Sequence, residues 1–409
     1  MNAQEQARPV GGRILTPPFL ALTALAALSA VLILWRFVAG LGASTALNDG
    51  YPWGLWIAFD VVTGTALACG GYAVALLVYV LNRGRYHTLV RPALVTSALG
   101  YSIAGLSVAI DVGRPWLIWK VPLFFWHWNH RSVLLEVAMC IMLYTLVAWI
   151  ELSPAFLERG ETSSNPKVRS FSRKVLPAVR RGLPFFIAFG LLLPTMHQSS
   201  LGSLLLLSGP RLNALWNTPL LPLLFLLSCL AMGYGAVIIE STLSSRFLGR
   251  PLELMMLSRL SRVMAWILSV YLAIRICDLF VRNSLLAALF RFDLFSIMTW
   301  VELALLAGPI VLLASSERRR DPGNLFLAAM LLLLGGALYR FDVYLVAFQP
   351  GPQWSYFPSV TEILITTGLV AGEIAAYIAL IKLFPILSGR KPTAPARAAV
   401  LGRSYMTAD

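Results

Sequence analysis

Ten long apolar runs limit what this chain can fold into. Each run holds about 20 or more mostly apolar residues, the length that an α-helix needs to cross a hydrocarbon core about 30 Å thick. Charged residues make up only 13% of the sequence, whereas ordinary soluble domains carry about 25%. We therefore expect an integral membrane protein with spans near 16–41, 54–81, 91–112, 131–152, 182–205, 219–245, 259–285, 294–314, 323–347 and 358–386.

The basic residues indicate how these spans are oriented. The formal net charge is +14, and 24 of the 33 Lys and Arg residues fall in or beside alternate loops when the N-terminus is placed in the cytoplasm. This is the positive-inside pattern of membrane proteins, so the charge does not indicate a nucleic-acid partner. Both termini are expected to be cytoplasmic. The longest inner loop, 153–181, is interpreted as a solvated linker without chemistry.

The runs also predict the domain organisation. The fold class is all-α, with ten transmembrane helices arranged as two four-helix bundles and two peripheral helices. The expected segments are a cytoplasmic N-terminus (1–15), a peripheral helix and outer loop (16–53), a first bundle (54–205), a second bundle (206–347), an outer loop and last helix (348–387), and a disordered tail (388–409).

Four ionisable side chains are predicted to share one layer near the outer membrane surface. Counted at about 1.5 Å per helical residue, Asp60, Glu136 and His197 lie roughly 8 to 10 Å from the outer ends of their spans, and Asp111 ends its span. Ionisable residues inside spans are costly and usually functional. Two simpler roles stay open: Asp111 could pair with Arg114, and His197 could be a hydrogen-bonded core residue.

A lipid-soluble quinone suits this layer better than haem or a metal ion. A membrane haem commonly uses two helix histidines, but only His197 of the four histidines lies well inside a span. The four cysteines form no CxxC pair, so an iron–sulphur cluster in this chain is not expected. Quinone reduction takes protons as well as electrons, and Asn129 and Gln198 add polar groups to the acids. The expected site is a haem-free quinone pocket without a metal ion.

The outer loops 48–56, 116–130 and 348–357 are rich in aromatic residues. Such residues form a belt at the membrane interface. They could equally form a docking face for an extracytoplasmic partner and a lid over the site.

A second series of polar residues follows in the later spans. Two readings stay open: ion pairs such as Arg275 with Asp278 or Arg340 with Asp342, or a proton route from the inner surface. Glu240, Glu302 and Glu373 step through the membrane as a relay requires. The full series is Glu240, Arg275, Asp278, Glu302, Arg340, Asp342, Glu362 and Glu373.

Several segments resemble a known family. Gly50-Tyr-Pro-Trp-Gly-Leu-Trp-Ile-Ala-Phe-Asp60, Asp111-Val-Gly-Arg114 and Leu193-Pro-Thr-Met-His-Gln-Ser-Ser200 are similar to the HybB-type membrane subunits of bacterial nickel–iron hydrogenases. These subunits belong to the wider NrfD and polysulfide reductase membrane-subunit family. The similarity runs from about residue 11 to residue 387.

The resemblance implies a function and a set of site residues. Members are quinone-reactive subunits of the bacterial inner membrane, and they pair with a periplasmic four-cluster iron–sulphur protein and with hydrogenase small and large subunits. Electrons from hydrogen reach menaquinone or ubiquinone held in the first bundle. Asp278 stands where the family has glutamate. The matching positions are Trp53, Asp60, Asp111, Arg114, Glu136, His197 and Gln198.

The expected roles follow from the chemistry of these side chains. His197 would donate to a quinone carbonyl, and the acids would hydrogen-bond the headgroup or deliver protons. Arg114 would keep Asp111 ionised and stabilise negative charge that develops on the quinone. The alternatives are another oxidoreductase of the same family, a secondary transporter, or a passive membrane anchor.

Overall fold

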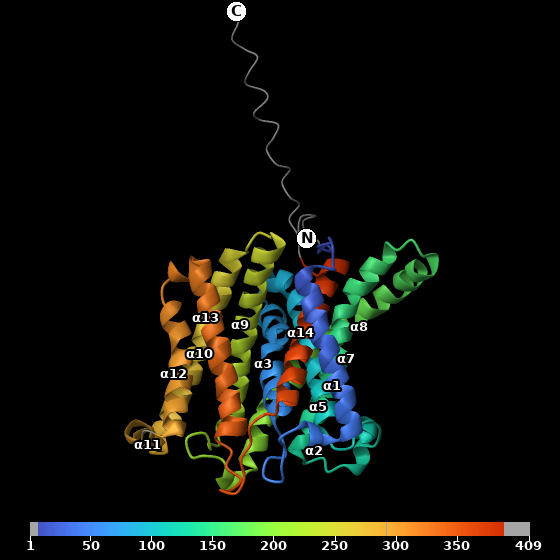
Figure 1. Ribbon diagram of the computed structural model, residues 1–409. Helices are drawn as coiled ribbons and strands as arrows, with labels where there is room; N and C mark the ends of the chain where they lie inside the picture. Colours follow the sequence, from blue (N-terminus) through green and yellow to red (C-terminus); the bar gives the residue numbers. More distant parts are fainter. Residues whose placement is uncertain (1–6, 292, 388–409) are drawn as a thin grey trace, which may run out of the picture.

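The computed structural model describes residues 7–291 and 293–387, and nearly all of this part is helical (Figure 1). No β-strand occurs within these ranges, so the predicted all-α class is confirmed. The predicted tail, 388–409, lies outside the described residues. Ten helices in the described part are long and apolar enough to span a membrane: α1 (Pro17–Ala39), Trp56–Val80, Gly84–Asp111 with α5 (Val90–Asp111), α7 (Val133–Glu161), α8 (Pro166–Leu206), α9 (Leu221–Leu248), α10 (Leu254–Val281), α12 (Leu294–Leu312), Pro322–Val346 with α13 (Pro322–Phe341), and α14 (Val360–Leu383).

Helix α9 joins two groups of helices. It packs against α4 (Gly70–Ala75) and α8 on one side and against α10 and α13 on the other, and α12 completes the second group. Helices α5 and α7 pack together in the first group (Figure 1). The peripheral helices α1 and α14 pack on each other, and α14 also contacts α5. The domain boundaries themselves stay predictions.

The two ends of the described chain meet at one face of the bundle. Arg8 N donates to Leu387 O and Val10 N donates to Ile381 O, both at 3.0 Å. We call this end the terminus face. The opposite end, where α5 finishes and α14 begins, is called the loop face. That the terminus face is cytoplasmic stays a prediction.

The second span is not a regular α-helix. It consists of the π-helix η1 (Trp56–Thr63), α3 (Gly64–Leu67), α4 and a second π-helix, η2 (Leu76–Val80). A third π-helix, η8 (Asp342–Val346), follows α13. Extra residues in a helical turn change which backbone carbonyls are free, and such bulges are frequent at functional sites. Here the Val62 carbonyl of η1 and the Tyr344 carbonyl of η8 accept side-chain hydrogen bonds.

The predicted solvated linker at 153–181 is wrong. Helix α7 continues to Glu161, and α8 begins at Pro166, so most of this segment is a helical hairpin. Ser132 and Asn165 cap the two helices by accepting backbone N–H groups. The basic residues of 167–181 made the segment look polar, although they occupy the exposed side of a helix.

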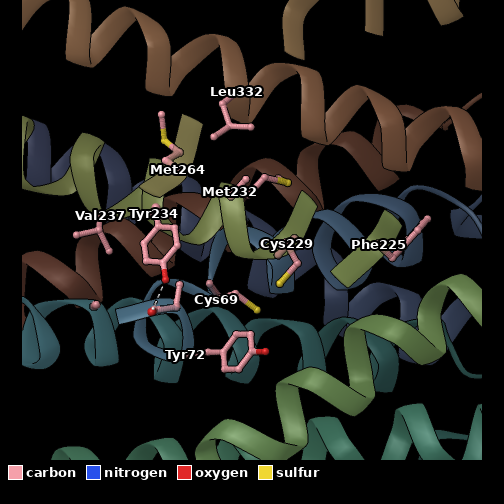
Figure 2. Packing of buried hydrophobic residues seen from close by; sticks show 14 of the residues in the cluster. Cys69, Tyr72, Phe225, Cys229, Met232, Tyr234, Val237, Met264 and Leu332 are labelled. Carbon is pink, nitrogen blue, oxygen red and sulfur yellow. Dashed lines mark hydrogen bonds between the residues drawn. The ribbon is translucent and has the colours of Figure 1, made fainter. Parts of the chain in front are cut away.

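The core between the two groups depends on close contact of backbones. Tyr234 of α9 donates to the Ala73 carbonyl of α4 at 2.9 Å, beside Cys69, Cys229 and Met232 (Figure 2). A Cβ atom on Gly233 would lie only 2.7 Å from the Cys69 carbonyl oxygen. Glycine at this position therefore sets the distance between α9 and the second span.

We predict that Gly233→Ala lowers the thermal stability of the purified protein in detergent. The added methyl group would meet backbone atoms, and overpacking of this kind costs about 1–3 kcal/mol. Gly105→Ala is the matched control, because its Cβ would find only Ile141 Cγ2 at 3.9 Å. Both changes raise helix propensity equally, so equal unfolding temperatures for the two variants would contradict the prediction.

Candidate functional site

Asp60 lies in a buried polar group close to the loop face. Its Oδ2 atom accepts from Thr366 Oγ1 of α14 at 3.0 Å, while its Oδ1 atom is buried without a partner. Ser107 of α5 lies beside Asp60, and its hydroxyl also lacks a partner of normal geometry. The indole N–H of Trp56, packed against Ile110 and Ile365, is likewise unsatisfied. Unsatisfied buried polar atoms are rare in native proteins and mark ligand sites or water.

Asp111 faces Arg36 and does not pair with Arg114. Arg36 of α1 is buried and donates to the Val112 carbonyl at 2.7 Å, and its charge acts on Asp111. Arg114 is exposed and forms no ion pair with any described residue. The expectation that Arg114 holds Asp111 ionised is therefore wrong. One oxygen of Asp111, Oδ1, is buried without a partner.

No hydrogen bond or ion pair among the described residues joins Glu136 or Asn129 to these acids. Glu136 is half-buried in the first turn of α7, and its carboxylate has no partner among the described residues. Asn129 is exposed, and its Oδ1 atom accepts from the Arg131 backbone N–H within the same loop. Asn129 is therefore held within its own exposed loop and does not belong to the buried site.

His197 and Gln198 meet the second span at Thr65. All three side chains are fully buried. Thr65 Oγ1 donates to the Val61 carbonyl at 2.6 Å, and it accepts from Gln198 Nε2 at 3.0 Å. His197 Nε2 lies 3.2 Å from the same oxygen. Because the single hydroxyl proton is already used, His197 must donate from Nε2, which leaves Nδ1 as a proton acceptor. Nδ1 is buried and has no partner.

Arg340 of α13 links this group to α9. Its guanidinium is fully buried and donates to the Val62 carbonyl, the Gln198 amide oxygen and the Phe225 carbonyl at 3.1, 3.2 and 3.1 Å. It also donates to Ser228 at 3.0 Å. No carboxylate of the described residues pairs with it, so the suggested Arg340–Asp342 ion pair is absent. Arg340 belongs with the predicted site residues His197 and Gln198.

Trp53 and the loop before α14 close the loop face. The Trp53 indole donates to the Tyr344 carbonyl at 2.9 Å, and its ring packs 4.8 Å from that of Phe348. Tyr356 donates to Glu362 Oε1 at 2.6 Å. Burial, together with this hydrogen bond to a carboxylate, raises the pKa of Tyr356 well above its usual value, so the hydroxyl stays protonated. Trp53 and Tyr356 therefore fix the loop segments that lie over the loop face.

Glu362 is a structural cap and does not offer a free carboxylate for proton transfer. It forms a capping box with Ser359 at the start of α14. Its second oxygen accepts from the Ala46 and Ser359 backbone N–H groups, both at 2.9 Å. Both carboxylate oxygens of Glu362 therefore accept hydrogen bonds that hold the fold together.

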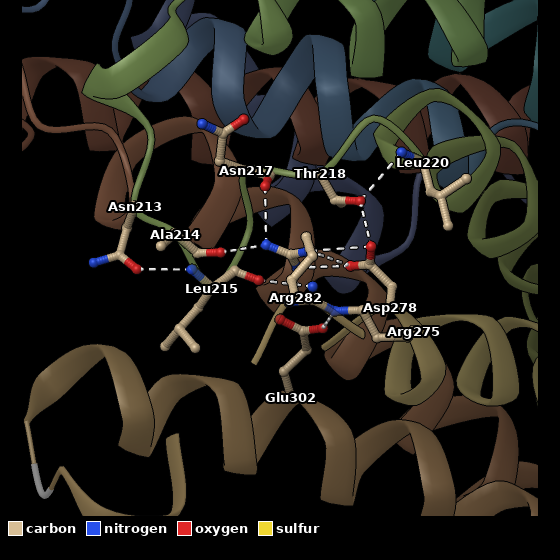
Figure 3. A network of polar contacts seen from close by, with 10 residues as sticks. All are labelled: Asn213, Ala214, Leu215, Asn217, Thr218, Leu220, Arg275, Asp278, Arg282 and Glu302. Carbon is tan, nitrogen blue, oxygen red and sulfur yellow. Dashed lines mark hydrogen bonds and ion pairs between the residues drawn. The ribbon is translucent and has the colours of Figure 1, made fainter. Parts of the chain in front are cut away.

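The second group contains a separate ionic network (Figure 3). Asp278 pairs with Arg282 at 2.6 Å and not with Arg275. Arg275 faces Glu302 at 3.8 Å, and both side chains are fully buried. Trp216 also donates to Glu302 at 3.0 Å.

The predicted pairing of Arg275 with Asp278 is therefore wrong, although the idea of structural ion pairs holds for this group. Asp342 lies within electrostatic reach of Arg275 and Glu302, and both of its oxygens are buried without partners.

Glu240 and Glu373 lie on a different line from Glu302. Glu240 accepts hydrogen bonds from Tyr377 and from Thr96, the latter at 3.2 Å. It lines a cavity of about 560 Å³ at the terminus face. Glu373 precedes Tyr377 by one turn of α14, and it lies within electrostatic reach of Asp60. The predicted relay through Glu302 is not supported by any contact with these residues.

Several members of the site were not anticipated. These are Arg36, Trp56, Thr65, Ser107, Thr366 and Tyr377. Arg36 was the only one with a clear signal, since a charge near the end of an apolar run needs a partner. The hydroxyl and indole groups are common inside spans, so only their three-dimensional neighbours distinguish them.

Comparisons with known proteins place the chain in a family. A family model described as "Polysulphide reductase, NrfD" matches residues 43–349. The chain is 43% identical to the "Probable Ni/Fe-hydrogenase 2 b-type cytochrome subunit" of Escherichia coli (strain K12), over 93% of this chain and 95% of the relative. It is 29% identical to the "Menaquinone reductase, integral membrane subunit" of Nitratidesulfovibrio vulgaris, over 79% and 80% of the two chains.

The name of the E. coli relative corrects one prediction. A b-type cytochrome subunit carries haem, so the expectation of a haem-free chain is contradicted. The described residues do not fit a haem held between two buried histidines, because His87, His127 and His130 are all exposed and only His197 is buried. A haem would therefore need another kind of axial ligand beside His197.

The family match covers the spans from Trp56 to Val346 and most of the chain. The spans show a multi-pass integral membrane protein, and the relatives place it in the bacterial inner membrane. The chain belongs to the NrfD family of polysulphide reductase membrane subunits.

Proposed function

We propose that this chain transfers electrons between an iron–sulphur partner of a nickel–iron hydrogenase complex and the membrane quinone pool. The observation that carries the proposal is the layer of unsatisfied polar atoms near the loop face. Donor and acceptor groups gather there in an otherwise apolar setting: Arg36 Nε, Trp56 Nε1, Asp60 Oδ1, Ser107 Oγ and Asp111 Oδ1.

These groups match the needs of a menaquinone or ubiquinone headgroup. Two carbonyl oxygens require donors, which Trp56 and Ser107 supply, and reduction requires two protons, which Asp60 and Asp111 can deliver. The neighbouring surfaces of Ile110, Ile365 and Leu369 are apolar and suit a lipid tail. His197 Nδ1 carries no proton, so it can accept a proton but cannot donate a hydrogen bond to a quinone carbonyl.

The relatives support the same function. One is named as a hydrogenase subunit and another as a menaquinone reductase subunit. Both names describe subunits of larger complexes, so this chain has partner subunits. We propose that these partners are a periplasmic four-cluster iron–sulphur protein and the small and large hydrogenase subunits. The bound ligands are quinone and lipid.

A proton route from the terminus face would supply the site. Glu240 lines the cavity at that face, Tyr377 contacts Glu240, and Glu373 lies one turn further along α14 towards Asp60. Each proton taken from the far side and consumed near the loop face would move charge across the membrane, worth about 2.3 kcal/mol per 100 mV.

We expect Asp60→Asn to lower hydrogen-dependent quinone reduction in membranes that hold the assembled complex. The change keeps the side-chain volume and removes the proton donor, so a loss on the order of 100-fold is expected. Dye reduction by the hydrogenase subunits reports assembly and should not change. Asp293→Asn, an exposed cap of α12, is the control. Full quinone activity in the double variant Asp60→Asn, Asp111→Asn would refute this site.

The proton route is tested with Glu240→Gln and Tyr377→Phe in vesicles that contain the complex. Both variants should form less membrane potential for each quinol produced, because glutamine carries no transferable carboxyl proton and phenylalanine lacks the hydroxyl that donates to Glu240. A potential-sensitive dye measures the effect. Glu317→Gln removes an exposed acid between α12 and α13 and serves as the control. An unchanged ratio of potential to quinol in both test variants would rule the route out.

A further inference from the structure

The hairpin formed by the end of α7 and the start of α8 extends beyond what a bilayer core requires. Helix α8 has 41 residues, which at 1.5 Å per residue is about 62 Å, roughly twice the hydrocarbon thickness. Figure 1 shows this hairpin projecting sideways from the other helices at the terminus face. Its surface is therefore available to the headgroup region of the membrane.

The start of α8 is basic on its exposed side. Between Pro166 and Gly182 there is no acidic residue. The exposed cations of this stretch are Lys167, Arg169, Arg173, Lys174, Arg180 and Arg181. A row of cations at this depth attracts anionic headgroups.

An apolar stripe runs along the same helix. Phe171 and Phe185 are each 62% exposed, and Val168 is 43% exposed. Positions 171, 178, 185 and 189 follow helical spacing, so they lie on one side of α8 and continue into the lipid-facing part of the span. Cations that flank exposed aromatics are typical of a helix at the boundary between headgroups and acyl chains.

A cavity lies where this hairpin meets the bundle. It has a volume of about 880 Å³ and is lined by Arg85, Arg91, Arg159 and Arg180, with Glu158 as its carboxylate. Glu158 binds Arg91 at 2.7 Å and Arg180 at 3.1 Å. Arg85 and Arg159 are exposed and form no ion pair with any residue between 7 and 387 that the structure describes. The cavity therefore keeps an excess of positive charge.

We propose that this cavity and the start of α8 bind an anionic phospholipid. Its phosphate lies between Arg85 and Arg159, and its acyl chains start from the apolar lining residues Pro9, Pro385 and Ile386. The stripe of Phe171 and Phe185 lies on the opposite side of α8 from Arg180, so it contacts the surrounding lipid and not the cavity. A free phosphate would use the same arginines, but it would not use the apolar part of the lining. The cavity also far exceeds the size of one phosphate group.

The test uses the full chain in nanodiscs of phosphatidylcholine with or without phosphatidylglycerol, followed by native mass spectrometry of the retained lipid. The variant Arg85→Gln, Arg159→Gln should retain less phosphatidylglycerol, by about five-fold for each arginine. The variant Arg259→Gln, Arg262→Gln removes the same charge from exposed positions on α10 and is the control. Equal retention by both double variants would overturn the proposal.

A second arm separates lipid from soluble phosphate. Inorganic phosphate in excess should not displace phosphatidylglycerol from the parent protein, and the water-soluble glycerol phosphate, which lacks acyl chains, should bind less tightly than the lipid. Displacement by phosphate, together with glycerol phosphate bound as tightly as the lipid, would show a site for a soluble anion and would refute lipid binding. Circular dichroism and size exclusion confirm folding, which exposed substitutions should not disturb.

Discussion

The arrangement of the first group depends on a buried cation without a carboxylate. Arg340 is fully buried, and an unpaired charge in such a place is tolerated only when its donors are bound. Its nitrogen atoms reach oxygens or sulphur on the second span, α8 and α9. The π-helix η1 supplies one of them, the Val62 carbonyl. Arg340 thus fixes where Gln198 lies, and Gln198 with Thr65 fixes the orientation of His197.

The two polar networks near Arg340 differ in the charges that they bring together. Around Arg275 and Glu302, charges of opposite sign face each other, and Trp216 supplies a further donor. This ion pair helps to hold the second group together, although Glu302 Oε1 and both oxygens of Asp342 are buried without hydrogen-bond partners. Near Asp60 and Asp111 the polar atoms lack partners, so the first group keeps capacity for a ligand. Both groups contain unsatisfied polar atoms, and what distinguishes the first is that neither Asp60 nor Asp111 forms an ion pair with any described residue.

The fold could be predicted from the sequence because lipid imposes one local rule, that a span is a long apolar helix. The site could be predicted only in part. Asp60, His197 and Gln198 were identifiable as polar residues inside spans, but their partners come from distant segments. Asp111 meets Arg36, which lies 75 positions earlier, and Arg114, three positions later, points into solvent. The start of α8 was mistaken for a linker because charges on one exposed side conceal helical periodicity.

The hairpin and the proposed quinone site lie at opposite faces of the protein, and each has its own role there. Electrons would enter at the loop face, where aromatic residues and Tyr356 cover the acids. Protons would enter at the terminus face, where Glu240 opens into a cavity. A protein that moves charge between these faces must stay at a fixed position along the membrane normal. A shift along the normal would move the polar groups of one face into the hydrocarbon core. A basic hairpin bound to anionic headgroups anchors the terminus face at a fixed depth, and it does so from outside the helices that carry the acids.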